Sequence, residues 1–325
     1  MKWLKNINYL RYIPQVKRNR ISEQSSILKQ IWQHKILYLM LFPCVIFFFV
    51  FSYLPMAGMV LAFKEFRYDT GIWGGEWVGL KYYERFFSDS MSWNYIWNTL
   101  IISFMKLVLA LPFPIILALM FNEIANDKLR TIVQSITYIP HFLSWVVVIG
   151  IVQSILAPNT GLVNEIIKLS GGDGNRFFLM EPESFYPIMF SSYVWKDIGW
   201  NSVIYFAAIV GISPQLYEAA MIDGANRLKQ VLYVTIPSIM PTILVLFILS
   251  LGNILSAGFD QIYLLQTPGN LSVSEIIDTY VIKTGLKGGD FGYATAIGLI
   301  QGVIGLIIVL IVNFITHKKY ETSLW

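Results

Sequence analysis

Charged residues are scarce in this chain of 325 residues. Lys, Arg, Asp and Glu make up 14% of it, whereas hydrophobic residues make up 55% and the mean hydropathy is +0.57. An average soluble domain carries about 25% charged residues, so the chain lacks the polar surface that a soluble fold needs. This excludes a disordered chain, a basic nucleic-acid-binding domain and most soluble enzymes. The net charge of +4 is small, and its distribution is more informative than its size.

Cysteine and histidine are also rare. Cys44 is the single cysteine, so no disulfide can form within the chain. His34, His141 and His317 are far apart in the sequence and show no metal-ligand spacing, so we expect no metal site. The first 35 residues are basic and polar, and the apolar run after them is too long for a cleavable signal peptide and lacks a small-residue cleavage site.

Long apolar runs are what the sequence has instead. A helix that crosses a bilayer needs about 20 predominantly apolar residues, and six segments meet this requirement. The second segment contains Pro112 and Pro114, which is acceptable because neighbouring helices can satisfy the carbonyls that a proline leaves free. The pattern predicts an all-α polytopic membrane protein with six transmembrane helices. The six segments are residues 36–60, 94–120, 132–156, 185–211, 239–259 and 293–315.

Lysine and arginine indicate how these spans are oriented. Six spans place both termini on one side, which carries fourteen Lys and Arg residues against eight on the other. Cytoplasmic loops hold the excess of basic residues, so we expect a multi-pass protein of the cell membrane with both termini in the cytoplasm. The expected domains are a basic tail at 1–35, a transmembrane domain at 36–316 and a cytoplasmic tail at 317–325. Residues 22–35 read as a short amphipathic helix or as an ordinary solvated segment.

The cytoplasmic loop between the fourth and fifth spans, residues 213–238, has a distinct pattern. Ser213 followed by Pro214 is a favourable helix start. A run of strong helix formers then reaches Gly224, which is typical of a helix end. A second amphipathic piece leads from there to Pro237. The loop is therefore predicted to form two short helices joined at a glycine, a rigid surface for a cytoplasmic partner.

This loop resembles the EAA loop of ABC importer permeases. Glu218, Ala219 and Ala220 are followed by three residues, Gly224, nine residues, and Val234-x-Ile236-Pro237. The family pattern has Ile-x-Leu-Pro at the end, so Val234 and Ile236 are conservative departures. The coupling residues that the resemblance implies are Glu218, Ala219, Ala220, Asp223, Gly224 and Pro237.

Two further stretches are similar to patterns of carbohydrate permeases. Residues 76–87 together with Trp97-Asn98-Thr99-Leu100 resemble the stretch before the second span of those proteins, and Asp290-Phe-Gly resembles the opening of their last span. The resemblance covers nearly the whole chain from about residue 36. The nearest group is the polysaccharide and oligosaccharide permeases of the maltose-permease type, although this chain lacks the extra N-terminal spans and the large external domain of the maltose permease itself.

The resemblance implies a type I ABC importer transmembrane fold and a set of partners. These are a second EAA-type permease that completes a heterodimer, a cytoplasmic ATPase dimer and an extracytoplasmic solute-binding protein. The chain contains no G-x-x-x-x-G-K-[ST] phosphate-binding loop. We therefore expect ATP and Mg²⁺ on the partner ATPase, no cofactor in this chain and no enzymatic activity of its own.

Polar residues inside the fourth and fifth spans are the candidates for a substrate path. An ionisable side chain within the bilayer is costly and usually functional. Lys196 and Asp197 point about 100° apart on a helix, so at least one is expected to face a wet cavity, whereas Lys106 is expected to snorkel or to face the partner. Residues 193–200 lie 18–25 positions ahead of Glu218, where the resemblance implies sugar contacts. The candidate path residues are Tyr193, Trp195, Lys196, Asp197, Trp200, Asn201, Asn253 and Ser256, and a polar clamp to the partner permease is the alternative.

Oligosaccharide import by a permease subunit is the favoured function, and two other classes stay open. A stand-alone ion-coupled transporter or channel would show an inverted repeat, and no convincing three-plus-three repeat is visible. A membrane-embedded enzyme would show His or acidic clusters at one depth, and none is visible. Aromatic rings suit sugar faces and Lys196 suits a uronate carboxylate, so acidic oligosaccharides derived from alginate or pectin are a specific hypothesis.

Overall fold

The computed structural model describes residues 32, 34–251 and 257–320. In these ranges the regular structure is helical, and the β contacts are two isolated bridges, Lys64 with Trp77 and Arg67 with Gly71. The predicted all-α fold class is confirmed. The chain divides into two units, residues 1–57 and residues 58–325. The expected amphipathic helix at 22–35 lies outside the described residues except at its C-terminal end.

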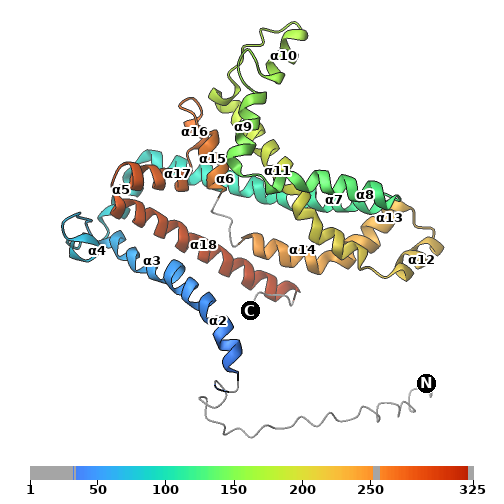
Figure 1. The fold of residues 1–325 in the computed structure, drawn as a ribbon, viewed down its shortest axis with the longest axis horizontal. Coiled ribbons are helices and arrows are strands. Elements are labelled where there is room, and N and C mark those ends of the chain that lie inside the picture. Colours follow the sequence, from blue (N-terminus) through green and yellow to red (C-terminus); the bar gives the residue numbers. More distant parts are fainter. Residues whose placement is uncertain (1–31, 33, 252–256, 321–325) are drawn as a thin grey trace. The chain divides into compact units, whose positions relative to one another are not determined.

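The helices follow one another with short connections (Figure 1). The first unit contains α2 (Lys35–Phe48), the π-helical turn η1 (Phe49–Tyr53) and α3 (Leu54–Met56), and η2 (Ala57–Phe63) begins at its last residue. The second unit continues with α4 (Gly71–Gly74), α5 (Lys81–Ser88), α6 (Ser90–Ala110), α7 (Pro112–Glu123), α8 (Asp127–Tyr138), η3 (Ile139–Phe142), α9 (Trp145–Ile155) and α10 (Leu162–Leu169). Its remaining elements are η4 (Phe178–Met180), α11 (Pro182–Val210), α12 (Pro214–Ile222), α13 (Arg227–Gln230), η5 (Val231–Thr235), α14 (Ile236–Leu251), α15 (Phe259–Leu265), α16 (Leu271–Ser274), α17 (Ile277–Ile282), η7 (Lys283–Lys287) and α18 (Phe291–Tyr320).

Four helical stretches of the described chain are long and apolar enough to cross a membrane, and two bent helix pairs pass the same test together. The bends measure 101° between η3 and α9 and 70° between α11 and α12. Counted as one span each, the bent pairs give the six spans predicted from sequence. The four stretches are Lys35–Phe63, Ser90–Glu123, Arg227–Ser250 and Phe291–Ile311.

Two of the predicted spans differ from the structure. The third, 132–156, is not one straight helix, because Pro140 has no N–H to continue the ladder and Ser144 caps a new helix by accepting a hydrogen bond from the Val147 N–H at 3.4 Å. The fifth begins at Arg227 rather than at residue 239, since the second helix of the loop at 213–238 runs directly into the span. The last helix, α18, extends to Tyr320 and so includes the first residues of the tail that was expected at 317–325.

The second unit is built around α11, which contacts α6, α7, α8, α9, α14, α15 and α16. In Figure 1 it lies along α7 and α8. Gly199 permits this approach, because a Cβ there would lie 2.0 Å from the Thr137 carbonyl oxygen. Both halves of α11 carry buried apolar residues. One buried cluster contains Ile102, Phe185, Met189 and Ile262, and another contains Ala118, Tyr205, Ile209 and Ile239.

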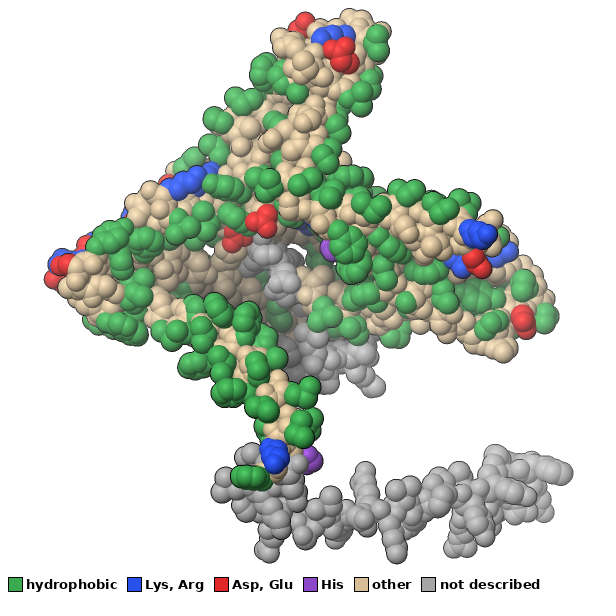
Figure 2. Space-filling view, viewed as in Figure 1, with side chains coloured by type: hydrophobic (Ala, Val, Ile, Leu, Met, Phe, Trp, Pro, Cys, Tyr) green, Lys and Arg blue, Asp and Glu red, His purple; other side chains and the backbone are tan. Residues whose placement is uncertain are grey.

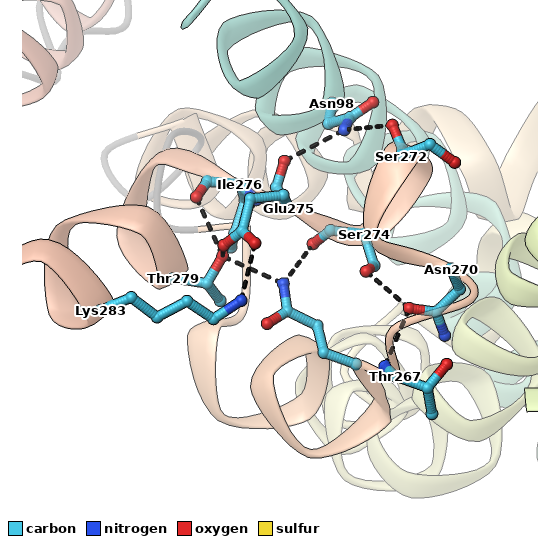
Figure 3. A network of polar contacts seen from close by, with 10 residues as sticks. Asn98, Thr267, Asn270, Ser272, Ser274, Glu275, Ile276, Thr279 and Lys283 are labelled. Carbon is cyan, nitrogen blue, oxygen red and sulfur yellow. Dashed lines mark hydrogen bonds and ion pairs between the residues drawn. The ribbon is translucent and has the colours of Figure 1, made fainter. Parts of the chain in front are cut away.

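A buried polar network anchors the segment between α15 and η7 to α6 (Figure 3). The Asn98 amide donates to the carbonyl oxygens of Ser272 at 3.1 Å and Glu275 at 3.0 Å. The neighbouring Thr99 hydroxyl accepts a hydrogen bond from the Ile277 N–H at 3.0 Å. Asn98 and Thr99 belong to the Trp97-Asn98-Thr99-Leu100 motif, so this motif serves to hold residues 272–277 in place.

The carboxylate of Glu275 is the charged centre of the same network. It accepts hydrogen bonds from the Lys283 ammonium at 2.6 Å and from the Thr279 hydroxyl at 2.8 Å. The Glu275 side chain is only 10% exposed, so both partners are needed to offset the cost of removing this charge from water.

Large hydrophobic side chains remain exposed along the long helices. Figure 2 shows them over much of the visible face, while Lys, Arg, Asp and Glu side chains gather towards the ends of the elements. Phe104, Phe142 and Val146 are each at least 60% exposed. A soluble monomer rarely exposes so much contiguous apolar surface, whereas a protein covered by lipid and by other subunits does.

Candidate functional site

The loop after α11 folds as the predicted pair of short helices, α12 and α13. Ser213 occupies the N-cap position of α12 with extended backbone, and Pro214 is the first helical residue, although the Ser213 hydroxyl makes no capping hydrogen bond. Asn226 caps α13, its side-chain oxygen accepting a hydrogen bond from the Lys229 N–H at 2.9 Å. We call this pair of helices, residues 214–230, the coupling hairpin.

Gly224 ends the first helix of the coupling hairpin. Its φ is +75°, its N–H donates to the Met221 carbonyl at 3.0 Å, and the Ala225 N–H donates to the Ala220 carbonyl at 2.9 Å. This pair of bonds is a Schellman motif, which needs a left-handed residue at this position. A Cβ on Gly224 would meet no atom within 4 Å, so the backbone conformation and not crowding restricts the residue here.

Side-chain contacts hold the coupling hairpin against the start of the next span. The Tyr217 hydroxyl lies 2.9 Å from the Thr235 hydroxyl, and the Gln230 amide donates to the Ala225 carbonyl at 2.9 Å. The span then passes through the π-helical turn η5 to Pro237, which has no N–H for the helical ladder. The hairpin is thus a rigid extension of α14.

The outer surface of the coupling hairpin combines acids with apolar side chains. Glu218, Ala219, Asp223 and Gly224 are exposed, whereas Ala220 is partly buried. Exposed apolar side chains surround these residues, and contact between apolar side chains and water is unfavourable. A rigid surface that combines acids with such side chains is suited to docking another protein. These apolar neighbours are Leu216, Met221, Ile222 and Leu228, which are 49%, 57%, 87% and 67% exposed.

A polar cluster lies at the middle of α11, on the other side of the bend. Lys196 is 6% exposed, and its ammonium donates to the His141 carbonyl at 2.7 Å. One Asp197 carboxylate oxygen lies 3.0 Å from His141 Nδ1 and 3.9 Å from Lys196 Nζ. The Lys196 ammonium also lies 5.3 Å from the centre of the Trp145 ring. Lys196 therefore fastens the break between η3 and α9 to α11.

A cavity of about 330 Å³ lies beside this cluster. Tyr193 and Asp197 contribute to it from α11, and Lys106 contributes from α6. A second cavity of about 300 Å³ shares Tyr193 with the first and includes Trp200 and Asn201. Polar and aromatic groups together make these cavities suitable for a hydroxyl-rich ligand. The lining of the first cavity includes Ser103, Lys106, Trp145, Tyr193, Asp197 and Ser250.

The predicted path residues fall into three groups. Tyr193, Asp197, Trp200 and Asn201 line the two cavities. Trp195 and Lys196 are absent from both linings: Trp195 is 48% exposed, and the Lys196 ammonium donates to the His141 carbonyl. Asn253 and Ser256 lie outside the described residues.

Sequence reasoning missed Lys106 and His141 as members of the site. Lys106, for which we expected snorkelling or contact with the partner permease, lines the first cavity, and its ammonium donates to the Ala257 carbonyl at 2.8 Å. A lysine within a span was the available signal, because a charge at the bilayer centre costs about 3 kcal/mol on insertion scales and calls for a function. His141 gave no such signal: its partner Asp197 is 56 residues away, and its ring stacks on Trp200 at 5.0 Å.

Comparison with known families decides what kind of protein this is. Residues 110–318, from the end of α6 to α18, match the family described as "Binding-protein-dependent transport system inner membrane component". The chain belongs to this family. The predicted ABC permease family is therefore confirmed, and the chain is a multi-pass membrane permease. The coupling hairpin and the second cavity lie inside the matched region, whereas the first cavity also takes Ser103, Lys106 and Leu107 from the part of α6 before it.

The permease is similar over at least 90% of its length to proteins that handle polysaccharides. It is 42% identical to the polygalacturonan/rhamnogalacturonan transport system permease protein YteP of Bacillus subtilis (strain 168), over 93% of this chain and 94% of that protein. It is 40% identical to a chain in the crystal structure of a bacterial ABC transporter involved in the import of the acidic polysaccharide alginate, with a TM-score of 0.84 over 90% of this chain and 99% of that chain. The same comparison gives 39% identity, a TM-score of 0.85 and coverage of 92% and 100% for a bacterial alginate ABC transporter in complex with an alginate pentasaccharide-bound periplasmic protein. The type I importer fold is thus confirmed.

Proposed function

We propose that this permease is the transmembrane subunit of an ABC importer that moves acidic oligosaccharides into the cytoplasm. The observation that carries the proposal is the continuity of α11 with the coupling hairpin. The helix that lines both cavities reaches α12 after residues 211–213 and a bend of 70°. A displacement of the hairpin is therefore passed directly to the cavity walls, as a mechanical link between ATP hydrolysis and substrate access requires.

The chemistry of the relatives supports an acidic substrate. Polygalacturonan is a polymer of a sugar acid, and alginate is described as an acidic polysaccharide. In this chain the aromatic rings of Tyr193 and Trp145 line the first cavity, where such rings can cover the faces of a sugar. Substrates with several carboxylates and several pyranose rings fit both features.

The partners we propose are a second permease, a pair of cytoplasmic ATPases and an external solute-binding protein. The exposed acids Glu218 and Asp223 on the coupling hairpin would face the ATPase, with ATP and Mg²⁺ bound by that partner. Under this proposal the permease has no catalytic residue and both of its termini lie in the cytoplasm, in keeping with the excess of Lys and Arg on that side.

Reconstitution of the complete transporter in proteoliposomes tests this function. With the binding protein outside and ATP inside, we expect uptake of trigalacturonate that stops when ATP is omitted. Uptake that needs neither ATP nor the binding protein and instead follows an ion gradient would contradict the proposal and favour a secondary transporter.

A further inference from the structure

Lys106 and Lys196 both lie in the interior of spans, yet their surroundings differ. The Lys196 ammonium is enclosed by the protein: it donates to the His141 carbonyl at 2.7 Å, lies 3.9 Å from Asp197 and faces the Trp145 ring. With 6% of its surface exposed, Lys196 has little access to a solute. The Lys196 ammonium therefore has a structural role, which is to hold α11 against η3 and α9.

Lys106 is also packed within the protein, but its side chain is partly exposed, whereas Lys196 is buried. Its ammonium lines the first cavity and makes one hydrogen bond to the protein, to the neutral Ala257 carbonyl at 2.8 Å. Among the residues that the structure describes, no carboxylate lies within 4.0 Å of its Nζ. An ammonium has three N–H donors, so one hydrogen bond leaves Lys106 able to donate into the cavity, where the Asp197 carboxylate supplies a favourable charge at longer range.

The backbone beside Lys106 is shaped to accept the ammonium. Ala257 and Gly258 both have positive φ, +38° and +83°, just before α15. A Cβ on Gly258 would lie 2.3 Å from Lys106 Nζ, so any other residue at this position would displace the ammonium. The turn therefore leaves room for the ammonium at the cavity wall and presents the Ala257 carbonyl to it.

The other groups of the cavity complement a sugar acid. Tyr193 lies under the ammonium, with its ring centre 5.2 Å from Nζ, and the Trp145 ring is part of the same lining. Asp197 also lines the cavity, but His141 and Lys196 lie next to its carboxylate and reduce its repulsion of an anion. A volume of about 330 Å³ lies within the range of ligand pockets.

We propose that Lys106 is the residue of this permease that recognises the substrate's negative charge. Its ammonium exchanges the Ala257 carbonyl for a uronate carboxylate, a charged acceptor that forms the stronger hydrogen bond, while Tyr193 and Trp145 contact the sugar ring. This assignment replaces the expectation that Lys196 performs the task, and it rests on the proposed function of the permease in importing acidic oligosaccharides.

The test compares uptake of trigalacturonate with uptake of its methyl ester, which keeps the sugar rings and removes the negative charge. The complete transporter is reconstituted with wild-type permease, Lys106→Gln, Lys106→Arg or Lys196→Gln. Both substrates are delivered by the same binding protein, so its own preference cancels when each variant is divided by wild type. Uptake of the ester also reports whether a variant has folded.

Lys106→Gln should lower the ratio of acid to ester uptake by about tenfold or more, the effect expected for loss of a hydrogen bond between charged groups. Lys106→Arg, which keeps the charge, should preserve most of the ratio. Lys196→Gln should lower uptake of both substrates to a similar extent. An unchanged ratio in Lys106→Gln, or a ratio lowered by Lys196→Gln alone, would overturn the proposal.

Chemical restoration of the charge provides an independent measurement on one folded sample. Cys44 is the only cysteine, so a Cys44→Ser, Lys106→Cys permease carries a single thiol. Aminoethyl methanethiosulfonate would return an ammonium to this position, and methyl methanethiosulfonate would not. Recovery of the acid-to-ester ratio with the first reagent alone supports the role of Lys106, and equal effects of the two reagents contradict it. Lack of ATP-dependent uptake of either substrate by wild type would instead refute the proposed function.

Discussion

The guanidinium of Arg85 donates a hydrogen bond to Oδ2 of Asp290 at 2.7 Å and lies 4.1 Å from the centre of the Tyr293 ring. The two partners are 205 residues apart and belong to two separate sequence motifs, residues 76–87 and Asp290-Phe-Gly. The hydrogen bond to Asp290 is the main cause that raises the pKa of Arg85 above its ordinary value. Asp290 also accepts a hydrogen bond from the Tyr293 N–H at 3.2 Å, so the pair fixes the start of α18 against α5.

Replacing Arg85 by Met should destabilise this junction modestly. The side chains of Arg85 and Asp290 are 58% and 31% exposed, and ion pairs at such sites contribute about 0–1 kcal/mol, to which the lost contact with Tyr293 adds. Thermal unfolding of the purified complex should show a lower melting temperature for Arg85→Met than for Arg67→Met, since Arg67 forms a longer ion pair of 3.6 Å with an exposed Glu65. Equal melting temperatures in the two variants would show that the contacts of Arg85 with Asp290 and Tyr293 do not stabilise the permease.

Gly224→Val should abolish transport while the permease still inserts into the membrane. A β-branched residue at a φ of +75° breaks the Schellman motif, at a cost of roughly 1–2 kcal/mol or more for the left-handed backbone, and reorients the coupling hairpin. Gly211→Ala is the matched control, because Gly211 has a φ of −75° and its nearest contacts would be 3.5 Å away. ATP-driven uptake and membrane yield are measured together. Normal uptake by Gly224→Val would remove the coupling role of this turn.

Asn98→Leu should destabilise the permease by about 1–3 kcal/mol, because the buried carbonyl of Glu275 and the partly buried carbonyl of Ser272 lose their shared donor. Asn94→Leu provides the control, because Asn94 lies one turn earlier on α6 at an exposed position. Thermal denaturation in detergent, followed by the loss of helical circular dichroism, compares the two. A larger loss in Asn94→Leu would contradict the anchoring role of Asn98.

Both termini should be inaccessible from outside the cell. In a Cys44→Ser background, a cysteine added after Trp325 should not react with a membrane-impermeant maleimide in intact cells and should react once the membrane is opened. A cysteine at Asp173, in the loop between α10 and α11, should label in intact cells because it lies on the opposite side in the predicted topology. The reverse pattern would overturn the orientation and move the coupling hairpin outside.

The sequence by itself determined the class of protein, the six spans and the coupling hairpin. These features rest on local properties: hydropathy summed over about 20 residues, the distribution of Lys and Arg, and a glycine whose left-handed backbone is a property of the residue itself. The Glu218–Pro237 motif is likewise contiguous, so its pattern and its fold could be derived together.

Tertiary structure alone decided which lysine faces the cavity. Lys106 and Lys196 are both single cations in apolar helices, and the acid that follows Lys196 does not tell which of the two ammonium groups faces a cavity. The difference arises because α11 packs against the break between η3 and α9, where the His141 carbonyl receives the Lys196 ammonium, while α6 packs beside Ala257 and Gly258 at the cavity wall. Contacts between residues 55 and 151 positions apart depend on how helices pack, which a local pattern does not contain.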